Sequence, residues 1–140
     1  LTVFATECWT WSLLPVQTTL GSGIVSVNRP CPAFGEMTPD EGRDLAGVVR
    51  AVERGLAGAF GADRVNYTMF MMNDPHLHML AFPRYARACT FAGRVWTDEA
   101  WPGLLRFPRG GQEVEPDQLQ RIRERLAGAA AVRRATPATG

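Results

Sequence analysis

The chain has 140 residues, of which 46% are hydrophobic and 21% charged, a size and balance typical of one globular domain. Its 15 cations are all arginine and oppose 14 anions, so the net charge of +1 excludes a nucleic-acid binder that works by bulk charge, and the lack of lysine excludes Schiff-base chemistry. Three scattered cysteines, two histidines and the lack of an apolar run of about 18–20 residues predict a cytoplasmic protein with no disulfide framework, no metal centre, no cofactor and no membrane segment.

The first part of the chain predicts two short strands. Residues 7–14 are aromatic and β-prone, and strand alternation places Trp9 and Trp11 on one face. The valine-rich segment 23–27 predicts a second, central strand. Two prolines within residues 29–33 then predict a loop, because proline cannot donate to a strand ladder.

A capping box predicts the start of a long helix. Thr38 is followed three residues later by Glu41, with proline at the first helical position between them. Apolar residues then recur at helical spacing, with arginine and glutamate mainly on the other side. Gly61 is suited to the left-handed turn that ends a helix. The sequence therefore predicts one amphipathic helix over residues 39–60.

The second half predicts a hairpin and a second helix. Residues 65–72 and 76–82 read as two strands joined by a turn, and residues 86–112 as irregular. A second helix is expected to start at 115–117, and the Ala-, Thr- and Pro-rich tail from Gly128 is expected to fray. The apolar face of that helix is formed by Leu119, Ile122 and Leu126. The pattern as a whole predicts an α+β fold, an antiparallel sheet with helices on one side.

The two histidines of the chain lie two residues apart. On a strand, His76 and His78 point to the same face. A neutral imidazole is a good nucleophile and a good acid or base near pH 7, provided that an acceptor holds its other ring nitrogen. Spacing alone leaves two alternatives: half-buried polar residues of a strand, or a weak metal pair with Asp74 as the nearest third ligand.

The segment around this pair resembles the signature of the histidine triad (HIT) family. Residues 75–85 read PHLHMLAFPRY, similar to a motif of histidines alternating with apolar residues that is followed by Pro-Arg-Tyr. The helix entry at 37–41 is similar to the family's entry to its long helix. In all, residues 3–85 follow the family's order of strands, helix and motif, and order, spacing and motif agree.

The resemblance implies a HIT-like fold: an antiparallel sheet of about five strands, one long helix packed on it and a C-terminal helix. Residues 1–112 would form the domain, with 113–140 as the C-terminal helix and flexible tail, and the protein would be a homodimer. Family members are hydrolases or transferases that cleave nucleotides or related phosphate compounds at the α-phosphate. By position, His78 is the nucleophile that forms a nucleotidyl-histidine, and His76 orients it through its backbone carbonyl and side chain.

Two positions depart from the family pattern. Leu80 stands where the family has its third histidine, and leucine cannot donate a hydrogen bond to a leaving group. Pro30 replaces another phosphate-side histidine. Three functions therefore remain open: nucleotidyl hydrolysis or transfer, a different reaction on a non-nucleotide small molecule such as a lyase step, and nucleotide binding without turnover.

Further candidates for substrate contacts are Asn73, Arg84, Phe4, Trp11 and Arg29. Arg84 has the geometry to hold a phosphate in two hydrogen bonds, but it is equally suited to an ion pair at the surface. Asn73 fits either a phosphate contact or a turn. The resemblance implies that Phe4 and Trp11 could stack on a base, as the first strand does in the family, with core packing as the alternative. The acidic pair at 98–99 is more typical of a solvated loop than of a catalytic acid pair.

Overall fold

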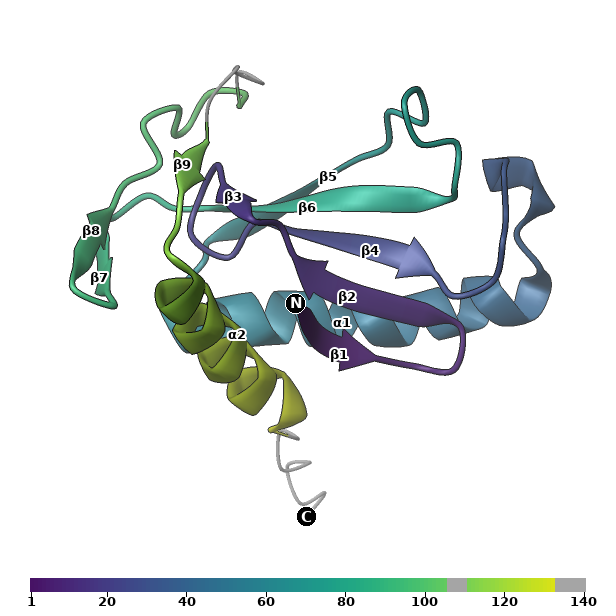
Figure 1. Cartoon of the computed structure of the whole chain (residues 1–140), viewed down its shortest axis with the longest axis horizontal. Helices are drawn as coiled ribbons and strands as arrows, with labels where there is room; N and C mark the ends of the chain where they lie inside the picture. Colours follow the sequence, from purple (N-terminus) through teal and green to yellow (C-terminus); the bar gives the residue numbers. More distant parts are fainter. Residues whose placement is uncertain (106–110, 133–140) are drawn as a thin grey trace, which may run out of the picture.

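The centre of the molecule is a five-stranded antiparallel sheet with the strand order β1-β2-β4-β6-β5 (Figure 1). The computed structural model describes residues 1–105 and 111–132. The strands are β1 Thr2–Ala5, β2 Trp9–Leu13, β4 Gly23–Val27, β5 Arg64–Thr68 and β6 His78–Arg84. The predicted α+β class with an antiparallel sheet is confirmed. Because β6 lies between β4 and β5, the strand that begins at His78 is paired on both sides.

The long helix α1 (Pro39–Phe60) has the predicted bounds. The Thr38 hydroxyl accepts from the Glu41 amide at 3.2 Å, and the Glu41 carboxylate accepts from the Thr38 amide at 2.8 Å. This reciprocal pair satisfies two amides that the first turn leaves without partners. At the other end Gly61 has φ +72°, a left-handed conformation that glycine adopts at little cost.

The core lies between the sheet and α1, which crosses behind β1 and β2 in Figure 1. Trp9 and Trp11 are fully buried, as are Val52 and Leu56 of the helix. The approach is close at Gly55, where a Cβ would lie 3.1 Å from the Trp11 ring. The alternation predicted for this strand is thus confirmed, and it turns both tryptophans toward the helix.

The second helix, α2 (Pro116–Ala131), packs against α1 and the edge strand β1. Its Ile122, Leu126 and Ala130 are fully buried, in line with the predicted apolar face. The Arg123 guanidinium donates to the Thr2 carbonyl at 2.8 Å and so ties the helix to the first strand. The helix continues through Ala131 instead of fraying at residue 128. The rest of the predicted tail, 133–140, lies outside the described residues.

Short elements complete the fold: the 3-10 helix η1 (Phe34–Glu36) and four strands in two small sheets, β3 (Val16–Gln17) with β9 (Gln112–Glu113) and β7 (Cys89–Phe91) with β8 (Arg94–Trp96). The prediction of irregular structure over 86–112 is therefore wrong for its first part, where β7 and β8 form a hairpin. None of the helices in the described part of the chain is long and apolar enough to cross a membrane.

Several strands differ from the prediction. The strand β1 was not predicted, because its support comes from pairing with β2 and packing under α2. The strand expected over 65–72 ends at Thr68, and Met71 adopts a left-handed φ of +49° that no strand continues through. The strand expected over 76–82 is shifted to 78–84. It includes Pro83 because its pairing with β4 has already ended at Ala81.

Candidate functional site

The two histidines meet at the start of β6, and backbone carbonyls hold both rings. The Nδ1 atom of His78 lies 2.5 Å from the His76 carbonyl oxygen, and the Nε2 atom of His76 lies 2.8 Å from the Val27 carbonyl oxygen. A carbonyl only accepts, so each contacting ring nitrogen must carry the proton. His78 is therefore held with a lone pair on Nε2, while the lone pair of His76 is on Nδ1.

The backbone on either side of His76 is anchored, which explains how the pair is held. The Leu77 side chain is fully buried, and its amide donates to the Cys31 carbonyl at 2.7 Å. The His76 amide donates to the Asp74 carboxylate at 2.9 Å. Asp74 therefore caps the turn before the strand. Within the described residues, no group of three or more His, Cys, Asp or Glu side chains is placed to share a metal ion.

His78 lies on the face of the sheet opposite the tryptophans, and we call this the outer face. Its members include Thr10 and Ser12 of β2, Ile24 and Ser26 of β4, and His78 and Leu80 of β6. All six are half-buried, whereas the residues between them on the same strands are buried. A half-buried imidazole on this face is open to a ligand and still backed by the sheet.

The structure does not bring Trp11 to the histidines. Trp11 is fully buried on the helix-facing side of β2. Its role is therefore core packing, the alternative to base stacking that was predicted for it. Phe4 is paired with Trp11 across β1 and β2 and is partly buried against the core cluster. Neither ring has a free face next to His78. The sheet alternation that turned Trp9 and Trp11 inward decides this outcome.

Arg29 lies in the loop after β4, near the histidine end of the sheet, and is paired with Glu41. Its guanidinium forms an ion pair with the Glu41 carboxylate and donates to the Glu36 carbonyl at 2.8 Å. The hydrogen bond from Arg29, assisted by the Thr38 amide, lowers the pKa of Glu41 from 4.5 to about 2. Arg29 thus joins the loop to the start of α1 and brings no unpaired charge to a phosphate.

The depressed pKa of Glu41 predicts an acid-labile contact. The contribution of Glu41 to stability is fully present above its ordinary pKa of 4.5 and is lost as the pH falls toward about 2. We expect the free energy of unfolding to fall across this window more steeply in the wild type than in Glu41→Gln. Urea titrations at a series of pH values measure the difference. Equal slopes for the two proteins would show that the ion pair contributes nothing.

Arg84 lies at the far end of β6, six residues or about 20 Å along the strand from His78. It is only 4% exposed and donates to the Asp98 carboxylate at 2.6 and 3.3 Å and to Asn66 at 2.9 Å. Arg84 therefore forms an ion pair, as the alternative prediction had it, but the pair is buried and not at the surface. The expectation of a solvated loop is wrong for Asp98. Asn73 is exposed in the turn before the histidines, so its role in binding stays a prediction.

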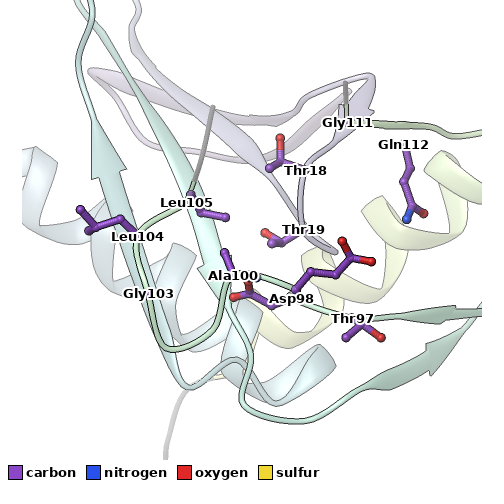
Figure 2. A pocket seen from close by; sticks show the side chains of 11 residues that line it. Thr18, Thr19, Thr97, Asp98, Ala100, Gly103, Leu104, Leu105, Gly111 and Gln112 are labelled. Carbon is purple, nitrogen blue, oxygen red and sulfur yellow. The ribbon is translucent and has the colours of Figure 1, made fainter. Parts of the chain in front are cut away.

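One hollow of the described structure lies away from the histidines. It has a volume of about 820 Å³ and lies between the Thr18–Thr19 turn and the segment 97–105, beside Asp98 (Figure 2). Because Asp98 pairs with Arg84, this hollow belongs to the opposite end of β6 from His78. Sequence reasoning missed it, since its lining comes from separate, short segments with no common motif.

The fold is similar to that of the histidine triad proteins. No protein-family model matches the sequence, and no curated protein matches it. Solved structures match the fold of the chain.

A histidine triad protein from Bradyrhizobium japonicum superposes with a TM-score of 0.74 at 14% identity, over 93% of this chain and 90% of that one. One from Marinobacter aquaeolei gives 0.71 at 18% identity, over 92% and 87%. A hypothetical histidine triad nucleotide-binding protein from Sulfolobus tokodaii gives 0.66 at 19% identity, over 92% and 82%. At these identities the likeness establishes the fold, which is the histidine triad fold implied by the sequence motif.

Proposed function

We propose that this protein hydrolyses or transfers nucleotidyl groups, with His78 attacking the α-phosphate of a small nucleotide derivative. The observation that carries the proposal is the 2.5 Å contact between His78 Nδ1 and the His76 carbonyl, which leaves the Nε2 lone pair available on a half-exposed ring. We also propose that the nucleotide derivative is the small-molecule partner and that the protein forms a homodimer.

The proposed step is a displacement at phosphorus. The Nε2 lone pair forms a P–N bond while the bond to the leaving group breaks, and the leaving group departs with that electron pair. Water or another acceptor then attacks the nucleotidyl-histidine, the P–N bond breaks, and the acceptor loses a proton. Splitting one displacement into two through a covalent intermediate is the general logic of nucleophilic catalysis.

The charges around His78 favour a substrate with little negative charge. The cation on the loop after β4, Arg29, is neutralised by Glu41, and Arg84 is buried with Asp98 at the other end of the strand. A polyphosphate chain needs cations near it, whereas a phosphoramidate or a mixed anhydride of a nucleoside monophosphate carries a single charge at phosphorus. We therefore propose these derivatives as the substrate class.

The intact mass of the protein after brief incubation with adenosine 5′-phosphoramidate tests the proposal. We expect a mass increase of one adenylyl group, or release of AMP. If the protein forms no adduct and releases no AMP but is stabilised against heat by AMP, catalysis is overturned. The second candidate, a nucleotide-binding protein without turnover, is then favoured. That candidate is favoured by the apolar pair that Leu80 and Ile24 form beside His78.

Leu80→His is expected to raise the turnover of adenosine 5′-phosphoramidate. Leu80 lies on the outer face between Ile24 and Thr68 of the neighbouring strands and donates nothing to a leaving group. A positioned donor is worth on the order of 10² in rate, so we expect a gain approaching that factor. Steady-state kinetics measures it, with Leu80→Met as the apolar control of similar volume. Equal rates for the two variants would show that Leu80 does not face the leaving group.

A further inference from the structure

The residue directly across the sheet from His78 is Ser26 of β4. The next pair along, Val27 and Leu77, is joined by a hydrogen bond from the Val27 amide to the Leu77 carbonyl at 3.2 Å. Hydrogen-bonded and non-hydrogen-bonded pairs alternate in an antiparallel ladder, so Ser26 and His78 form a pair of the second kind. Such pairs hold their Cα atoms about 4.5 Å apart, with the side chains close together. Ser26 and His78 are therefore neighbours on the outer face.

Among the polar groups of this face, Ser26 is the one paired directly with His78. Thr10, across from Ser26 on β2, donates its hydroxyl hydrogen to Asn28 at 2.7 Å. Within residues 1–105 and 111–132, no side-chain hydrogen bond engages Ser26, and its side chain is half-buried. The row next to it on β4 and β6 is the apolar pair Ile24 and Leu80. A hydroxyl with an available proton thus faces the same space as the His78 nucleophile.

We propose that Ser26 is a catalytic residue whose hydroxyl donates a hydrogen bond to a non-bridging oxygen of the phosphoryl group under attack by His78. This role rests on the proposed function. Ser26 keeps its proton throughout: the P–N bond to His78 forms, the bond to the leaving group breaks, and the hydroxyl only stabilises charge on the phosphoryl oxygen. In this arrangement the donor on the phosphate comes from β4, and the apolar Leu80 on β6 leaves the leaving-group side without one.

Single-turnover formation of the His78 adduct from adenosine 5′-phosphoramidate tests this role. We expect Ser26→Ala to slow adduct formation by on the order of 10², because one preorganised donor is lost, and Ser26→Thr to retain most of the rate. Ser12→Ala is the matched control, since Ser12 is a half-buried serine of the same face paired with Ile24. Equal melting temperatures for these proteins separate the effect from a loss of fold.

A phosphorothioate substrate adds a readout that a structural role does not move. Sulfur is a poor acceptor, so replacing a non-bridging oxygen is expected to slow the wild type and to slow Ser26→Ala much less. If Ser26→Ala reacts at the wild-type rate and is slowed by sulfur as much as the wild type is, the proposed role of Ser26 is overturned. The proposed chemistry of His78 would then still stand. Failure of the wild type to form any adduct would instead overturn nucleotidyl transfer itself, and the role of Ser26 with it.

Discussion

His78→Ala is expected to abolish the nucleotidyl adduct and to lower turnover by about 10⁴-fold or more, since removal of a covalent nucleophile leaves only binding and electrostatic effects. The His78 ring is half-exposed on the outer face and contacts the backbone of its own segment, so its removal creates no cavity in the core. We therefore expect the variant to fold and to bind AMP. Intact-mass spectrometry and turnover of adenosine 5′-phosphoramidate measure the loss.

His76→Ala is the informative control for this substitution. Alanine at position 76 keeps the backbone carbonyl that accepts from His78 and loses only the contact of the His76 ring with Val27. We expect it to form the adduct more slowly than the wild type, and His78→Ala to form none. An adduct that persists in His78→Ala would place the nucleophile elsewhere and contradict the proposed mechanism.

Local signals in the sequence predicted the parts of the fold that local contacts determine. The bounds of α1 follow from the capping box at Thr38 and the left-handed Gly61, both of which act within a few residues. The shared face of Trp9 and Trp11 follows from strand alternation. Alternation alone does not say which face meets the helix, so it did not decide between core packing and the base stacking that the family resemblance implied for Trp11.

The candidate site was found through its motif, but its neighbours required the register of the sheet. His76 and His78 are close in sequence, and the resemblance implied the carbonyl contact that the structure contains. Ser26 lies 52 positions before His78 (78 − 26) and meets it only through the pairing of β4 with β6. No pattern within either segment sets that register, so nothing in the sequence alone singles out Ser26.

Breaking the buried ion pair of Arg84 and Asp98 is expected to have the largest effect on stability among the polar substitutions considered. The side chains are 4% and 1% exposed, and the Asp98 carboxylate also accepts from the Tyr85 and Ala100 amides at 3.2 Å each. Asp98→Ala removes all of these acceptors and leaves a guanidinium buried without its counter-charge. Removing one partner of such a pair costs about 3–5 kcal/mol.

Urea denaturation followed by circular dichroism measures this cost, and the exposed pair of Asp40 and Arg43 supplies the control. Its side chains are 84% and 72% exposed, so Arg43→Ala is expected to cost less than about 1 kcal/mol. The pair formed by Arg84 and Asp98 joins β6 to the segment 97–105 beside the 820 Å³ hollow. If Asp98→Ala cost no more than Arg43→Ala, water entering from that hollow would be solvating Arg84, and the pair would not hold the segment against the sheet. A loss of several kcal/mol with adduct formation at His78 retained would instead assign Arg84 to the architecture of the strand's far end and not to phosphate binding.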